Sequence, residues 1–160
     1  MSKTLNKFLK DTGYIRVKLD FLKTKHYSLE ASINGINGRF ILDTGASNSC
    51  ICTSLENKFN VISQYSKEKA SSANSEISNT NISKRNTIQI GEWVDKLNLI
   101  TFEMNHINNA LIQKKIDKID GIIGADILKK SKSILDYETN NLYLKLWFDR
   151  FNYCYNWFFY

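Results

Sequence analysis

Alternating apolar and polar positions dominate the first third of the chain and predict short β-strands. Residues 14–21 (YIRVKLDF) show the two-residue period of a strand with one buried face. Residues 26–33 (HYSLEASI) predict a second strand, and residues 38–47 (GRFILDTGAS) a third that ends in a glycine-containing loop. Asn34-Gly35 and Asn37-Gly38 are dipeptides typical of tight turns, so a hairpin is expected between the second and third strands.

The remaining strand signals lie in the second half of the chain. Residues 87–94 and 96–104 resume the alternation with a short separator, and residues 133–137 and 141–147 flank a polar turn as a last hairpin. The stretch 63–84 is rich in Ser and Asn and poor in large apolar residues, which favours a linker or a mobile loop. Strands therefore outnumber helices, and we expect an all-β domain built as a closed or partly closed barrel.

Helical signals are sparse by comparison. Leu5, Phe8 and Leu9 have the spacing of a short amphipathic helix over residues 2–10. Asp11-Thr12-Gly13 then predicts its end.

Composition narrows the function classes. The chain has 160 residues, which fits one domain, and its formal net charge of +6 comes from scattered basic residues. This pattern favours a solvated basic surface over a nucleic-acid interface. The three cysteines and two histidines lack metal-ligand spacing, so neither a metal site nor another cofactor is expected. With no apolar run of signal-peptide or membrane-span length, we expect a cytoplasmic protein without stable membrane insertion.

The candidate chemistry lies in Asp43-Thr44-Gly45-Ala46, which follows the apolar run 40–42. A carboxylate at the end of a buried strand should be rigidly held and partly desolvated, and Gly45 lets its own amide approach that carboxylate. Thr44 offers a hydroxyl that can anchor the loop. The tripeptide alone is also an acceptable turn, and its other copy at residues 11–13 is interpreted as a helix stop.

Together with the block at 122–128, this loop resembles the retropepsin-like aspartic proteases, especially compact bacterial members with I-I-G-A-D. The resemblance implies a retropepsin-like acid-protease barrel over residues 14–145 with a short helix after the block at 122–128 (IIGADIL). The expected N-terminal helical segment (1–13) precedes this domain, and an aromatic tail (146–160) follows it. It also implies an aspartic endopeptidase that cleaves a peptide or protein substrate as a homodimer. Each copy would contribute Asp43 as the catalytic residue.

The resemblance assigns supporting roles as well. Thr44 would hydrogen-bond across the two-fold axis, and Gly124 would let the second block approach the active-site loop. Some family members carry Ser or Thr in place of Ala46, and that hydroxyl can stabilise the ionised carboxylate. Because Ala46 has none, the pair of carboxyls should titrate higher, with a mildly acidic to near-neutral optimum.

The substrate-binding flap is expected around Ser72, Ala73 and Asn74. The region 70–76 contains no glycine, and Asn74 could take the left-handed conformation in its place. This departure leaves open a non-catalytic retropepsin-fold module that binds a peptide or protein partner. The tail is the other open feature, because it could cover a subunit interface, touch a membrane surface or have no selected role.

Overall fold

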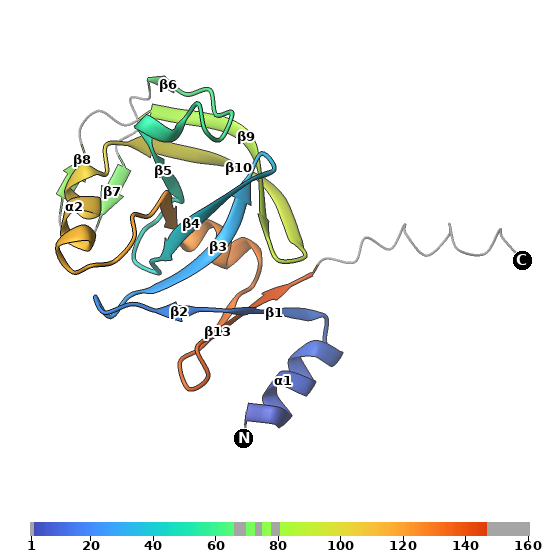
Figure 1. Ribbon diagram of the computed structural model, residues 1–160. Coiled ribbons are helices and arrows are strands. Elements are labelled where there is room, and N and C mark those ends of the chain that lie inside the picture. The colour runs from blue at the N-terminus through green and yellow to red at the C-terminus, as the bar shows by residue number, and fades with distance from the viewer. Residues whose placement is uncertain (1, 66–69, 73–74, 78–80, 147–160) are drawn as a thin grey trace, which may run out of the picture.

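The computed structural model describes residues 2–65, 70–72, 75–77 and 81–146 (Figure 1). Its described helices are α1 (Ser2–Asp11), α2 (Asn105–Gln113) and α3 (Ala125–Lys130). The described strands are β1 (Tyr14–Lys18), β2 (Asp20–Phe21), β3 (Tyr27–Ile33), β4 (Ile36–Leu42), β5 (Cys50–Cys52), β6 (Gln64–Tyr65), β7 (Ala70–Ser72), β8 (Ser75–Ile77), β9 (Asn81–Ile90), β10 (Trp93–Phe102), β11 (Gly121–Ile123), β12 (Ile134–Asp136) and β13 (Asn141–Lys145).

The main sheet closes on itself. Its strand order is β2-β3-β4-β11-β5-β10-β9-β6, and an additional pairing of β3 with β9 joins the two sides. Ser32 lies opposite Gln89 and Ile33 opposite Ile88 in that closing pair. The fold class expected from the sequence is therefore confirmed: a β-barrel with a short N-terminal helix and a short helix after the second block.

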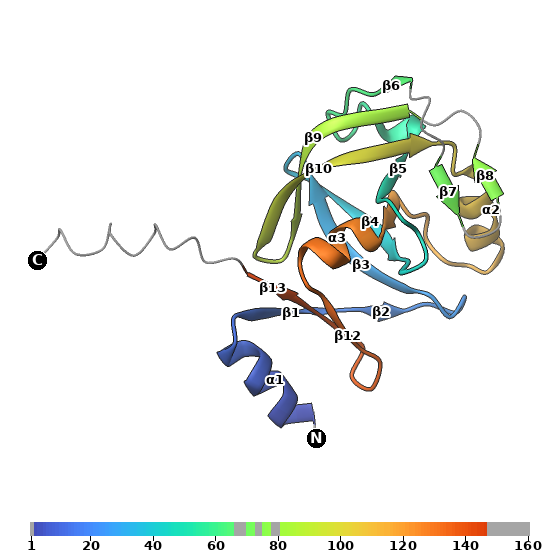
Figure 2. The same cartoon turned by 180° about the vertical axis from the view of Figure 1, so that it is seen from behind.

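A second, three-stranded sheet has the order β1-β13-β12 (Figure 2). The alternating segment 14–21, expected as one strand, is divided between this sheet and the barrel at Leu19. Leu19 is 2% exposed and its N–H donates to Asn140 O, so its side chain belongs to the core between strands β1 and β2 of the two sheets. The hairpin predicted at the end of the domain is present as β12 and β13.

The core is built mainly from the inward faces of the barrel. Phe40, Phe59 and Trp93 are among its largest fully buried side chains. The rings of Phe40 and Phe59 lie 6.2 Å apart and are tilted, which is a favourable arrangement for two aromatic rings. Apolar burial of this extent is the main source of stability for a domain of this size.

Two predicted turns need correction. Asn34-Gly35 does form a turn, but Asn37-Gly38 lies inside β4. A Cβ at Gly38 would lie 2.7 Å from the Phe59 ring and 2.9 Å from Asp120 Oδ2, so close packing explains this glycine. The hairpin of β9 and β10 turns at Gly91-Glu92, where Gly91 has φ +57°, and not beyond Val94.

Helix α2 was not predicted, and its sequence contains helix-disfavouring Asn residues. Asn108 is buried, and its side-chain amide exchanges two hydrogen bonds with the backbone of Ile119, at 3.1 and 2.9 Å. This pairing is a tertiary contact, so it leaves no periodic signal in the sequence. The predicted N-terminal helix is present as α1; it ends at Asp11, and the turn that follows contains Gly13 with φ +82°.

The polar stretch predicted as a linker or loop contains β6, β7, β8 and the start of β9. β7 and β8 pair as a hairpin, with Ser72 opposite Ser75. Ala73 and Asn74, two of the three expected flap residues, lie outside the described residues, as does the tail from residue 147. No helix in the described part of the chain is long and apolar enough to cross a membrane.

Candidate active site

The loop that follows β4 is anchored by a parallel strand from far along the chain. Ile41 pairs with Ile122 and Leu42 with Ile123, so β4 and β11 end side by side. The pairing continues one residue further, where the Asp43 N–H donates to Ile123 O at 3.0 Å. The backbone of Asp43 is therefore held at one end of the barrel by β11, which belongs to the second sequence block.

The Asp43 carboxylate is oriented by its own loop. The Gly45 N–H donates to Asp43 Oδ1 at 2.9 Å, which is the close approach expected from the sequence. A Cβ at Gly45 would lie 3.3 Å from that oxygen. Asp43 is exposed in the single chain, so the partial desolvation expected from its strand is absent here. The described part of the chain does not cover this carboxylate.

Gly124 lies directly against the Asp43 loop. A Cβ at this position would come within 2.8 Å of Ala46 O and of the Asn48 carbonyl group. The next residue adds a hydrogen bond, from the Ala125 N–H to Ala46 O at 2.7 Å. This contact leaves no room for any side chain at residue 124.

Two polar residues complete the contact between the blocks, and the sequence patterns assigned neither a role. Asp126 Oδ2 accepts from the Ser49 N–H at 2.8 Å, and Oδ1 accepts from Ser49 Oγ at 2.6 Å. Ser49 Oγ in turn accepts from the Gly124 N–H at 2.9 Å. Ser49 is fully buried, so these bonds satisfy polar groups that water does not reach. The sequence did contain one signal for this contact, namely an acidic residue, Asp126, two positions after Gly124 and in the first turn of α3.

Cys50 begins β5 directly behind this network. Burial raises the pKa of the Cys50 thiol to about 12, with smaller contributions from the charges of Asp126 and Asp43. A thiol with so high a pKa is protonated at neutral pH and is a poor nucleophile. The sequence interpretation of Cys50 and Cys52 as small buried residues agrees with their burial as free cysteines.

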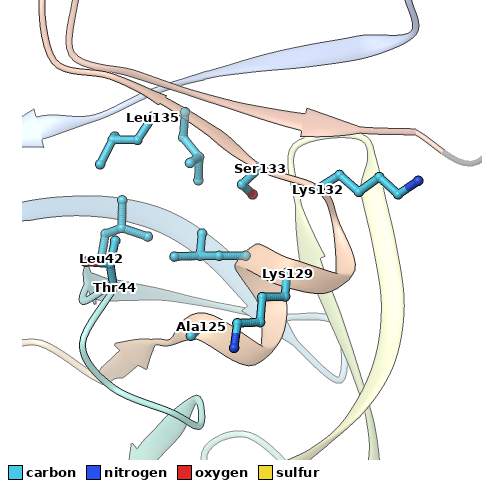
Figure 3. Close-up of a pocket in the computed structure, with 9 residues that line it drawn as sticks. Leu42, Thr44, Ala125, Lys129, Lys132, Ser133 and Leu135 are labelled. Atoms are coloured by element: carbon cyan, nitrogen blue, oxygen red, sulfur yellow. The ribbon is translucent and has the colours of Figure 1, made fainter. Parts of the chain in front are cut away.

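Thr44 is exposed on the side of the loop that faces a cavity of about 450 Å³. Figure 3 shows Leu42 and Thr44 on one side of this cavity and Leu135 on the other. The cavity lies between the end of β4, helix α3 and the β12–β13 hairpin. Its lining residues are Leu42, Thr44, Ala125, Leu128, Lys129, Lys132, Ser133, Leu135 and Leu142.

Carboxylate oxygens, hydroxyls and backbone N–H groups make up the described part of the site. Among the described residues, no group of three or more His, Cys, Asp or Glu side chains is placed to hold a metal ion. The Asp43 carboxylate itself can accept a proton, donate one when protonated, or accept hydrogen bonds. General acid and base chemistry is therefore within reach of this loop.

Comparison with known proteins finds one matching family and solved structures with a similar fold. A family model described as aspartyl protease matches residues 29–127, which include the Asp43 loop and all but the last residue of the second block. A retropepsin-like aspartic protease from Rickettsia conorii superposes with a TM-score of 0.55 at 17% identity, covering 82% of this chain and 90% of that one. The EIAV protease, solved with an inhibitor, gives a TM-score of 0.52 at 18% identity, covering 73% and 98%. No curated protein sequence matches significantly.

Proposed function

Since the chain belongs to the aspartyl protease family, we propose that it is an aspartic endopeptidase that uses Asp43 to hydrolyse peptide bonds. The observation that carries the proposal is the Asp43 carboxylate, held at the end of β4 by the Asp43 N–H bond to Ile123 O and oriented by the Gly45 N–H. The Rickettsia conorii and EIAV proteases share the fold at low identity, which supports the architecture.

The reaction needs two carboxyl groups in different protonation states. An ionised carboxylate takes a proton from water, which then attacks the peptide carbonyl, while a protonated carboxyl polarises the carbonyl oxygen. Two carboxyls about 3 Å apart share one proton because both cannot ionise, and the pair titrates as a unit. In aspartic proteases generally, this repulsion strongly raises the pKa of one carboxyl of the pair.

A homodimer would supply the second carboxylate. The described part of the chain contains one Asp-Thr-Gly that follows an apolar strand, and its carboxylate is exposed in the single chain. A two-fold axis near Thr44 would bring two Asp43 side chains together, because an isologous contact repeats the same surface on both copies. The edge strand β12 of the terminal sheet is available for strand pairing with a second copy.

The substrate would bind as an extended peptide between the Asp43 pair and the flap. Extended peptides pair with strand edges and place alternate side chains in pockets. The β7–β8 hairpin supports a flap in this region, since Ser72 pairs with Ser75 at its tip. The roles of Ser72, Ala73 and Asn74 remain proposals, as does a cytoplasmic location for the enzyme.

The direct test is to incubate the purified protein with a diverse peptide pool at several pH values, beside the Asp43→Asn variant. Asn keeps the size of the side chain but removes the ionisable group from both copies, so cleavage should fall to background. Peptide binding should persist because the strand edges are unchanged. Equal cleavage by the variant would contradict the assignment of Asp43.

The second candidate function is a non-catalytic module that binds a peptide or protein partner. Its specific support is the absence of glycine from residues 70–76, since a flap tip normally uses glycine to move. If the wild type and Asp43→Asn bind peptides equally and neither cleaves any, this second function is correct. Sedimentation at micromolar concentration tests the dimer separately, because a strict monomer that cleaves peptides would refute the two-fold arrangement.

A further inference from the structure

The cavity beside Thr44 is lined in part by apolar side chains that remain partly exposed in the single chain. Leu42 and Leu142 form buried parts of it, while Leu128 and Leu135 are only half-buried. Covering partly exposed leucines is favourable by about 25 cal/mol per Å² of apolar surface removed from water. A volume of about 450 Å³ is large enough for aromatic side chains of a peptide segment.

One segment of this chain has matching chemistry. Residues 147–160 number fourteen, and nine of them are Phe, Tyr or Trp. They follow β13, whose last residue Lys145 donates its N–H to Ser131 O at 2.8 Å. Ser131 directly precedes Lys132 and Ser133 in the cavity lining. The described residues that lead into the segment therefore lie near the cavity.

Its length also fits. Fourteen residues span at most roughly 46 Å when fully extended, from about 3.3 Å per residue, so a return to the cavity is well within reach. Lys129 lies exposed in the lining, and an ammonium group is attracted to the face of an aromatic ring. The cavity therefore offers both apolar contact and a cation to an aromatic segment.

We propose that the aromatic segment 147–160 binds in the cavity lined by Leu128, Lys129 and Leu135 of its own chain. The segment of the same chain is favoured over that of a second copy because a short tether gives an effective concentration on the order of millimolar, above micromolar protein. Binding there covers the Thr44 side of the active-site loop. A bound segment therefore competes with the second copy of the chain for the surface around Thr44. This competition rests on the proposed function, in which that surface forms the dimer.

A disulfide experiment on the full chain tests the contact. Cys154 lies within the segment, whereas Cys50 and Cys52 are buried and do not compete for it. Lys129→Cys places a thiol at the cavity, and Lys130→Cys places a matched control thiol on the same helix, where the lysine is exposed, lies outside the cavity lining and reaches towards Asp95 instead. Both replaced lysines are exposed, so both variants should fold, which far-UV circular dichroism checks.

Under mild oxidation, Lys129→Cys should form its disulfide with Cys154 about tenfold faster than Lys130→Cys, because the two sites are equally near the start of the segment and only binding in the cavity favours one of them. The product should run as a monomer on a non-reducing gel. Equal rates at the two sites would overturn the proposal. A cross-linked dimer as the main product would also overturn it, because the segment would then occupy the second copy.

A second variant tests the aromatic contacts and the competition. Replacing Trp157, Phe158 and Phe159 together by serine should abolish the rate difference between the two cysteine sites, and a retained difference would contradict binding through these rings. In the chain without added cysteines, the same replacement should tighten the dimer about tenfold by sedimentation. An unchanged dimer affinity would refute the competition. Neither measurement depends on peptide cleavage, so failure of the proposed enzyme activity is seen separately.

Discussion

Ser49 and Asp126 are joined by two hydrogen bonds, from the Ser49 N–H to Oδ2 at 2.8 Å and from Ser49 Oγ to Oδ1 at 2.6 Å. Ser49 ends the Asp43 loop and Asp126 lies in the first turn of α3, so the pair connects two segments that are remote in sequence. Asp126 Oδ1 also accepts the Ile127 N–H at 2.8 Å. The Asp126 carboxylate therefore holds the Asp43 loop in place by accepting a hydrogen bond from the loop backbone at Ser49.

Asp126→Asn should destabilise the fold and lower any activity of the Asp43 loop. An amide has one acceptor oxygen, so its NH₂ group would face either the Ser49 N–H or the donors at Oδ1. Leaving a buried donor without a partner costs about 1–3 kcal/mol, which urea denaturation would measure. Asp11→Asn, at the exposed end of α1, is the control and should change stability by less than about 0.5 kcal/mol. Equal midpoints for the two variants would show that Asp126 does not brace the loop.

Gly124→Ala should be strongly destabilising. Its Cβ would lie 2.8 Å from backbone atoms of Ala46 and Asn48, which cannot move aside as a side chain can. We expect a loss of about 3 kcal/mol, the upper end for overpacked sites. Gly35→Ala is the matched control, because Gly35 has φ +83° and no atom within 4 Å of the added Cβ, so only backbone strain of about 1 kcal/mol applies. The prediction fails if thermal unfolding ranks these variants in the opposite order.

Ala46→Ser should move the acidic limb of the pH–rate profile to lower pH, provided that the proposed cleavage is detected. The Ala46 N–H donates to the Asp43 backbone carbonyl at 3.3 Å, so residue 46 belongs to the same turn as Asp43. An added hydroxyl that donates to the ionised carboxylate stabilises it and lowers the apparent pKa of the pair. An unchanged acidic limb in a folded variant would indicate that residue 46 does not face the pair. Ser47→Ala, at the exposed neighbouring position, is the control and should leave the profile unchanged.

Cys50 should make the fold less stable at alkaline pH. Its pKa rises from 9.0 to about 12 on folding, chiefly because burial disfavours the thiolate. The neutral thiol therefore favours the folded state fully below pH 9, and this contribution is lost as the pH rises towards 12. Above pH 9 the unfolded chain releases this proton first, so stability should fall by up to about 1.4 kcal/mol per pH unit from this group.

Urea unfolding of the wild type and Cys50→Ala at intervals from pH 8 to 11 measures this contribution. Cys50→Ala should show a shallower decline above pH 9, although removal of the buried sulfur lowers its stability at every pH. Parallel declines would mean that Cys50 ionises as readily in the folded protein as in the unfolded chain.

Local sequence patterns predicted most of the barrel strands and the two blocks of the site. Alternation identifies a strand because its side chains point to opposite faces, and this holds for β3 and β13 before any partner is known. Asp43 was found because a carboxylate and a glycine follow an apolar run. The Gly45 N–H bond to its carboxylate spans only two residues, so local geometry was enough to predict it.

The tertiary structure decided what depends on partners remote in sequence. Leu19 divides an alternating segment between two sheets, and Gly38 serves packing against Phe59 instead of a turn. Ser49 and Asp126 pair across 77 positions. A residue's own neighbours set its turn and strand preferences, but only the folded chain brings a buried hydroxyl to its carboxylate. For that reason the sequence alone could predict the loop that carries Asp43, and the fold alone could reveal what holds that loop in place.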